Sequence, residues 1–218
     1  MHCLSVSEQF QMRYFLARHG ETVYNAVARM QGNSAHTPLS RTGIAQAEAM
    51  GAALADFLAD PREIDIWAST AGRALQTVAI IVEHLHRNFF DVSTDPRLVE
   101  LEVGAWEGRL YADVIAADGV ILCTDRRLFT VQPPGGEDYP TVAARLRDWL
   151  VTLSPDRDVL VVSHGMTLRV LRGLLAAGEP FNGVPIAEDA PQGTMFLVEN
   201  GIETRLHLSD ATPRVGAV

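Results

Sequence analysis

The stretch YFLARHGETVYN, Tyr14 to Asn25, places an arginine, a histidine and a glycine directly after an apolar run. The run predicts a buried strand over Arg13 to Ala17. Ligand sites in open α/β sheets lie beyond the carboxyl ends of the strands. Arg18-His19-Gly20 therefore marks the sheet edge at which we expect the rest of the chain to supply ligand-binding groups.

Strand and helix patterns alternate along the rest of the chain. A second strand is predicted over Ile64 to Ala68, and the apolar run DVLVVSH, Asp158 to His164, predicts a late buried strand. TMFLVENGIETRLHL predicts a hairpin that turns at Asn200-Gly201. This order predicts an α/β fold, a three-layer α/β/α sandwich around a mostly parallel mixed sheet.

Helices are expected between these strands, from apolar residues at helical spacing. The first opens with Ser40 or Thr42 as its cap, and the second runs from about Gly72. Two more are expected over Asp138 to Leu153 and over GMTLRVLRGLLAAG, residues 165–178. The expected inward-facing positions are Ile44, Ala47, Gly51, Leu54 and Leu58; Leu75, Val78, Val82 and Leu85; and Val142, Leu146, Trp149 and Leu153.

The length of 218 residues, without a repeat or a linker, predicts one domain over 1–218 with a core from about 12 to 208. No apolar run reaches the roughly 18 residues of a transmembrane helix, and the first residues lack the features of a signal peptide. Cys3 and Cys123 have no metal or redox spacing and are expected to be free thiols. We therefore expect a cytoplasmic protein without a membrane partner. Residues 104–136, broken by glycine and proline, give the weakest pattern.

The charge pattern excludes several classes of function. A net charge of −9 argues against nucleic-acid binding, which needs a basic surface. All 18 basic residues are arginine, and the chain has no lysine. Schiff-base chemistry, pyridoxal phosphate anchored on lysine and the lysine of a P-loop are therefore excluded.

Reactive side chains follow several of the predicted strands. Arg18 and His19 follow the first, Arg73 lies in the first turn of the helix after the second, and His164 follows the late strand. Glu100 lies in the glycine-broken segment RLVELEVGAWEG. Taken singly, each has a structural explanation, because a histidine after a strand is commonly a hydrogen-bonded part of the fold. Their coincidence at one sheet edge indicates a site.

Phosphate is the group that best fits two arginines and a helix N-terminus. A neutral imidazole beside such a clamp is a competent nucleophile, and a carboxylic acid can protonate the leaving alkoxide. The sequence has no His-x-x-x-His pair with a carboxylate cluster, so we expect neither a metal nor a cofactor. The arginines would then neutralise the phosphate charge.

Seven segments in order resemble the histidine phosphatase superfamily, the phosphoglycerate mutase-like enzymes. They cover nearly the whole chain: RHGET, QG at residues 31–32, TPLSRTGIAQA, ASTAGRALQT, LVELEVGAWEG, PPGGE and VVSHG. The resemblance implies a metal-independent phosphomonoesterase that acts on a small phosphorylated metabolite through a phosphohistidine.

The resemblance also implies roles for single positions. His19 would be the nucleophile and Glu100 the general acid. The other implied residues are Arg18, Arg73 and His164 in the phosphate pocket, with Asn25, Thr22, Gln31 and Gly165 as further substrate contacts. The residues alone leave the acid open, because Glu102, Glu107 and Glu21 also lie near the motifs. The family spacing favours Glu100.

Two alternatives to a phosphatase remain. The first is a cofactor-dependent phosphoglycerate mutase, although the short middle segment and PPGGED are more typical of the phosphatase branch. Arg126-Arg127 could hold a second anionic group, but we favour their interpretation as a solvated helix face. The second is a non-catalytic phosphate-binding domain, against which the intact motifs argue. The expected partner is a small phosphomonoester, and a homodimer is left open.

Overall fold

A six-stranded sheet organises residues 12–58 and 64–208, the part of the chain that the computed structural model describes. Its strand order is β3-β2-β4-β1-β7-β8. Neighbouring strands from β3 to β1 are parallel, whereas β7 is antiparallel to both β1 and β8. The predicted mostly parallel mixed sheet is confirmed. Its strands are β1 (Tyr14–Arg18), β2 (Ile64–Ser69), β3 (Ser93–Asp95), β4 (Asp158–Ser163), β7 (Met195–Glu199) and β8 (Ile202–His207).

Alternation along the central strands divides the core into two layers. Leu16 packs on one face of the sheet with Val159 and Val161, whereas Phe15 and Ala17 pack on the other. All five side chains are fully buried. Successive strand residues point to opposite faces, so a strand that is apolar throughout needs a helix layer on each side.

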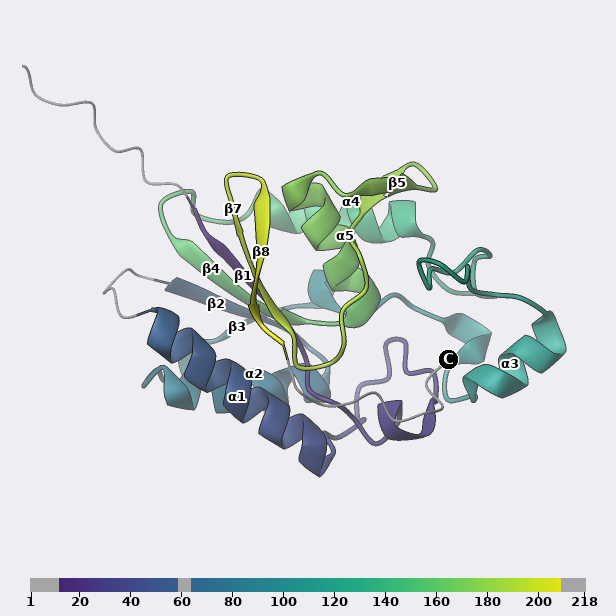
Figure 1. The fold of residues 1–218 in the computed structure, drawn as a ribbon, viewed down its shortest axis with the longest axis horizontal. Helices are drawn as coiled ribbons and strands as arrows, with labels where there is room; N and C mark the ends of the chain where they lie inside the picture. Colours follow the sequence, from purple (N-terminus) through teal and green to yellow (C-terminus); the bar gives the residue numbers. More distant parts are fainter. Residues whose placement is uncertain (1–11, 59–63, 209–218) are drawn as a thin grey trace, which may run out of the picture.

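Helices supply both of these layers (Figure 1). α1 and α2 pack on the face that carries Phe15, and α4 and α5 pack on the face that carries Leu16. The predicted three-layer α/β/α sandwich is therefore confirmed. The helices are α1 (Arg41–Phe57), α2 (Gly72–His84), α3 (Tyr111–Asp118), α4 (Tyr139–Leu150) and α5 (Gly165–Ala176).

The start of α1 decides between the two predicted caps and corrects one inward position. The Ser40 hydroxyl accepts the N–H of Gly43 at 3.1 Å, so Ser40 is the cap. Gly43 is pressed against the backbone of Glu21, where a Cβ would come within 2.0 Å of the carbonyl oxygen. This approach turns the helix so that Gly43 and Leu54 face inward, while Ile44 is 46% exposed. The prediction that Ile44 faces inward is wrong.

Residues 104–136, here called the cap segment, contain structure that the sequence pattern did not predict. α3 has eight residues, of which Val114 alone is buried, so its apolar pattern is too short to recognise. An isolated bridge joins Leu122 to Phe129. Arg126 and Arg127 lie on the turn that closes this bridge. The prediction that they lie on a helix is wrong, whereas Arg127 is exposed as expected and Arg126 is half-buried and donates to the carbonyl of Ile186 at 2.7 Å.

Other differences from the prediction concern the ends of helices and short elements. α4 ends at Leu150, short of the predicted Leu153, and α5 ends at Ala176. The hairpin is confirmed, with Asn200 and Gly201 at φ of 57° and 73° in its turn. A small hairpin and four 3-10 turns were not predicted: β5 (Glu179–Phe181) with β6 (Val184–Ile186), and residues 25–27, 89–91, 96–98 and 104–106.

Two further expectations concern membrane-spanning helices and the cysteines. Among the described residues, no helix is both long and apolar enough to cross a bilayer. Cys123 is a free thiol, as predicted, whereas Cys3 lies outside the described residues.

Candidate active site

Three neighbouring strands end at the same edge of the sheet. β4 lies between β2 and β1, with Ser163 opposite Arg18 in register. The N–H of His19 continues this pairing by donating to the carbonyl of Ser163 at 3.0 Å. His164 directly follows Ser163, and Arg73 lies in the first turn of α2. The sheet thus brings together Arg18, His19, Arg73 and His164, here called the arginine–histidine cluster.

His19 is 3% exposed, and one hydrogen bond fixes the tautomer of its ring. Nδ1 lies 2.7 Å from the carbonyl of Gly20, which can only accept, so Nδ1 carries the proton. Nε2 therefore carries the lone pair. Burial, followed by the charges of Arg73 and Arg18, holds the pKa of His19 well below its usual range. The ring is thus neutral and nucleophilic at neutral pH.

His164 packs edge-on against His19, with the ring centroids 5.1 Å apart. Nε of Arg73 donates to Nδ1 of His164 at 3.1 Å. The other nitrogen, Nε2, donates to the Ser69 hydroxyl at 2.7 Å. Burial, and then the positive charge of Arg73, lower the pKa of His164 well below its usual range. A neutral His164 can therefore orient Arg73 without adding positive charge.

Arg73 is 1% exposed and is held by the loop that follows the first strand. Nη2 donates to the carbonyl of Gly32 at 2.8 Å, and Nη1 donates to the carbonyl of Ser34 at 2.6 Å and to the Thr37 hydroxyl at 3.2 Å. Burial lowers the pKa of Arg73 to about 10, and the negative charge of Glu100 partly opposes this shift. Arg73 thus keeps a buried positive charge at neutral pH.

Arg18 is the second cation of the cluster. Its Nη1 donates to the carbonyl of Ala190, and its guanidinium lies against Gly165, where a Cβ would come within 3.0 Å of Cζ. Nε of Arg18 is buried, and nothing in the described ranges accepts a hydrogen bond from it. A buried donor without an acceptor requires an explanation, and a bound anion would supply one.

Glu100 is held at the start of α5. Its Oε1 accepts the N–H groups of Leu101 and Thr167 at 2.9 and 3.0 Å, and its Oε2 accepts the N–H of Met166 at 3.2 Å. These hydrogen bonds fix the carboxyl in place. Glu100 and His19 line the same cavity of about 70 Å³. A carboxyl group and an unprotonated imidazole nitrogen therefore share one small cavity.

The other carboxylates near the motifs point elsewhere. Glu102 and Glu107 are exposed, and Glu21 accepts a hydrogen bond from the Ser40 hydroxyl at 2.6 Å. Of these four acids, Glu100 is the one that lines the cavity with the cluster, within the described residues. No group of three or more His, Cys, Asp or Glu side chains in those residues is arranged to hold a metal ion.

The remaining predicted contacts divide into two sets. Asn25 and Gln31 line the cavity. The Thr22 hydroxyl lies 3.0 Å from Oδ1 of Asn25 and 2.9 Å from Oε1 of Gln31, so Thr22 supports these two side chains. In the part of the chain that is described, Thr22, Gly165 and His164 are not among the residues that line the cavity.

Several residues of the site were not predicted. Ser69 could have been found, because it ends β2 as Ser163 ends β4, at the edge where the site was expected. The others come from loops, from the cap segment and, for Met166, from the first turn of α5. The unpredicted lining residues are Arg29, Met30, Gly32, Leu101, Val103, Tyr111, Phe129 and Met166.

Comparisons with known proteins agree with this arrangement. The family model "Histidine phosphatase superfamily (branch 1)" matches residues 14–186. A 6-phosphofructo-2-kinase/fructose-2,6-bisphosphatase of Caenorhabditis elegans is 33% identical over 162 residues, 71% of this chain but only 32% of that protein. The glucosyl-3-phosphoglycerate phosphatase of Mycobacterium tuberculosis (strain ATCC 25618 / H37Rv) is 35% identical over 175 residues, 75% of this chain and 74% of that protein. The solved structure of the mycobacterial glucosyl-3-phosphoglycerate phosphatase with VO3 has a TM-score of 0.70 at 30% identity, covering 85% of this chain and 92% of the other.

Proposed function

The chain belongs to the histidine phosphatase superfamily, and on this premise we propose that it is a metal-independent phosphomonoesterase acting on a small phosphorylated metabolite. The state of His19 carries the proposal. Its Nδ1–H is held by the carbonyl of Gly20 at 2.7 Å, which leaves Nε2 unprotonated in a cavity shared with Arg18 and Arg73. A neutral imidazole between two guanidinium groups is suited to attack a phosphate ester.

The proposed reaction has two steps. In the first, Nε2 of His19 attacks phosphorus while the bond to the ester oxygen breaks, and Glu100 gives its proton to the leaving alkoxide. In the second, water attacks the phosphohistidine, Glu100 takes a proton from that water, and the P–N bond breaks to release inorganic phosphate. Arg18 and Arg73 stabilise the phosphoryl oxygens in both steps, which supplies positive charge without a metal.

In this proposal, the other predicted residues position Arg73 or contact the substrate. His164 positions Arg73 through the 3.1 Å hydrogen bond to its Nε. Asn25 and Gln31 contact the substrate, because both line the cavity. We also propose that residues 12–208 act as one catalytic domain in the cytoplasm. The family match over residues 14–186 and the pairing of the terminal hairpin with β1 support the single domain.

A phosphoglycerate mutase is the second candidate. The observation that favours it is the position of Arg127, whose Nη1 lies 3.9 Å from the same Asp189 carboxylate that Arg18 approaches at 3.8 Å. A mutase needs a cation of this kind beside the phosphate clamp, in order to hold the second charged group of its substrate.

Phosphate release from a panel of phosphomonoesters, without added metal and with EDTA, tests the proposal. The phosphatase releases inorganic phosphate from several esters, and EDTA does not change the rate. A mutase interconverts phosphoglycerates without releasing phosphate, and a binding domain does neither. Activity that is lost in EDTA and restored by Mg²⁺ or Zn²⁺ would contradict the metal-independent mechanism.

A further inference from the structure

Asp189 lies between an arginine of the arginine–histidine cluster and an arginine of the cap segment. Its Oδ1 is 3.8 Å from Nη1 of Arg18, and its Oδ2 is 3.9 Å from Nη1 of Arg127. Oδ1 also accepts the N–H of Ala190 at 2.8 Å, and the carbonyl of Ala190 accepts a hydrogen bond from Arg18. One short backbone segment thus holds a carboxylate against both guanidinium groups.

These groups lie beside the active-site cavity. Tyr111 and Arg18 both line that cavity. Burial raises the pKa of the Tyr111 phenol, and the charges of Glu100, Arg18, Arg127 and Asp189 all act on it. Asp189 lies beside the cavity because its carboxylate is 3.8 Å from Arg18, which lines the cavity.

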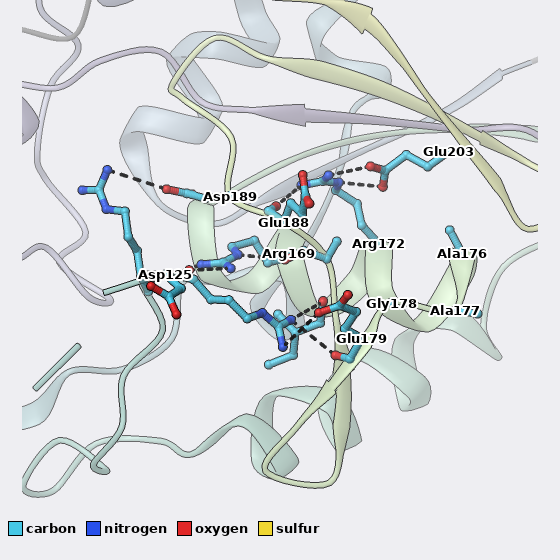
Figure 2. Close-up of a pocket in the computed structure, with 14 residues that line it drawn as sticks. Asp125, Arg169, Arg172, Ala176, Ala177, Gly178, Glu179, Glu188, Asp189 and Glu203 are labelled. Atoms are coloured by element: carbon cyan, nitrogen blue, oxygen red, sulfur yellow. Dashed lines mark hydrogen bonds and ion pairs between the residues drawn. The ribbon is translucent and has the colours of Figure 1, made fainter. Parts of the chain in front are cut away.

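The arginines on the other side of Asp189 are committed to the fold. They line a second cavity of about 560 Å³, which Asp189 and Arg127 also line (Figure 2). Arg169 donates to the carbonyl of Ala187 at 3.0 Å. Arg172 forms a bidentate salt bridge with Glu203, in which Nε and Nη2 donate to the two carboxylate oxygens at 2.8 and 2.6 Å. Figure 2 shows the carboxylate of Asp189 directed away from that pair. Asp189 therefore lies between the second cavity, which it lines, and Arg18, which lines the active-site cavity. A substrate group that extends past Arg18 would meet its carboxylate.

We propose that Asp189 is a specificity-determining residue, because its carboxylate acts as an internal counter-ion where a second anionic group of a substrate would otherwise approach Arg127. This inference rests on the proposed function. A leaving group with a carboxylate or a second phosphate would have to displace Asp189 from Arg127 and would meet its like charge. An uncharged leaving group meets no such repulsion. The site therefore favours phosphomonoesters with an uncharged leaving group.

Two matched esters test the proposal. Glycerol 3-phosphate and 3-phosphoglycerate share the same phosphorylated carbon and differ by a hydroxymethyl group against a carboxylate. The measured quantity is the ratio of kcat/KM for 3-phosphoglycerate to kcat/KM for glycerol 3-phosphate. We expect this ratio to rise about fivefold in Asp189→Asn, the size that a partly exposed charge interaction supplies. If Asp189→Asn acted only through Arg18, kcat/KM would change by the same factor for both esters, and the ratio would stay constant.

Two further variants separate the local pair from general charge effects. Glu188→Gln removes the same charge from an exposed side chain one residue away, so the ratio should stay at the wild-type value. In the Asp189→Asn background, Arg127→Gln should return the ratio to near wild type. An unchanged ratio in Asp189→Asn, an equal rise in Glu188→Gln, or a gain that persists without Arg127 would overturn the proposal.

The same design distinguishes this inference from the function on which it rests. If the wild type hydrolyses neither ester, the proposed function fails. Isothermal titration of both esters then gives the ratio of their Kd values in the same variants. A fivefold relative gain in affinity for 3-phosphoglycerate in Asp189→Asn supports the inference, and an unchanged ratio overturns it.

Discussion

Three residues of the arginine–histidine cluster line the same cavity as the cap segment, but the cluster and the segment are built in different ways. The cluster follows strands whose register fixes it, as the 3.0 Å bond from the N–H of His19 to Ser163 shows. The cap segment contributes Tyr111 and Phe129 from a short helix and an isolated bridge. Parallel strands converge on one edge, whereas loops are free to vary. In the mechanism that we propose, the sheet supplies the chemistry and the loops select the leaving group.

The largest expected effect is in the cluster. His19→Ala should lower phosphate release to below about one part in 10⁴ of wild type, because no other group supplies the nucleophile. Phosphate release from an alkyl phosphate measures this loss, and thermal melting checks that the variant stays folded. His84→Ala, in the last turn of α2, is the matched control and should keep near wild-type activity. Substantial turnover in His19→Ala would remove the cluster from the chemistry.

The next effect tests the carboxyl at the start of α5. Glu100→Gln should lower turnover of alkyl phosphates about 10²–10⁴-fold, the usual contribution of general acid catalysis. An aryl ester such as p-nitrophenyl phosphate has a good leaving group and should lose far less. Glu102→Gln is the control and should change neither substrate. Equal losses on both substrates, or the larger loss at Glu102, would identify the wrong carboxyl.

Two glycines, Gly165 beside the cluster and Gly119 in the cap segment, should respond differently to substitution by alanine. In Gly165→Ala the new Cβ would lie 3.0 Å from Cζ of Arg18, so kcat/KM should fall about tenfold as the guanidinium moves, with little change in stability. Gly119, at φ 82° and ψ −156°, has no heavy atom close enough to clash with a Cβ. Gly119→Ala should therefore cost about 1–3 kcal/mol of unfolding free energy through backbone strain and keep activity.

Enzyme assays and denaturant unfolding of these two variants measure both quantities. If Gly165→Ala loses stability but keeps activity, or Gly119→Ala keeps stability but loses activity, the expected difference between the two regions is contradicted.

The smallest effect is the pH dependence of stability. His19 and His164 have folded-state pKa values well below the usual 6.5, so the unfolded chain binds more protons as pH falls below about 6.5. The unfolding free energy is therefore fully present above about pH 6.5 and declines as pH falls toward the folded-state pKa values. Each histidine contributes up to about 1.4 kcal/mol per pH unit.

Unfolding free energies between pH 5 and 7 check this dependence. His164→Gln should lose one histidine's share of the slope, whereas Gly119→Ala should be destabilised by the same amount at every pH. An unchanged slope in His164→Gln would contradict the buried, neutral state of its ring.

The sequence predicted the sheet and the cluster because both follow from local patterns. Buried parallel strands give continuous apolar runs, as in β4, and Arg18, His19 and His164 directly follow such runs. Glu100 could not be separated from Glu102 by periodicity, because residues two apart share a face in an extended segment. The choice comes from a long-range contact: the Glu100 carboxylate accepts the N–H of Thr167 in α5, whereas the Glu102 side chain is exposed.

Other features had no local signal. Tyr111 lies in a segment broken by glycine and proline, and contacts with distant loops place it at the cavity. Asp189 belongs to the loop before β7 and is distant from Arg127 in the sequence. Only the folded structure shows that their side chains approach within 3.9 Å. Ile44 was assigned to the core by spacing, but the close approach of Gly43 to Glu21 set the rotation of α1.

The residue that carries the phosphoryl group in the intermediate distinguishes His19 from His164 as the nucleophile. The enzyme would be mixed with an ester that carries a radioactive phosphoryl group, quenched in base within milliseconds, and digested for peptide mapping. We predict acid-labile, base-stable phosphate on the peptide that contains His19 and its absence in His19→Ala. Phosphate found on His164, or turnover with no phosphoenzyme at any quench time, would contradict the mechanism.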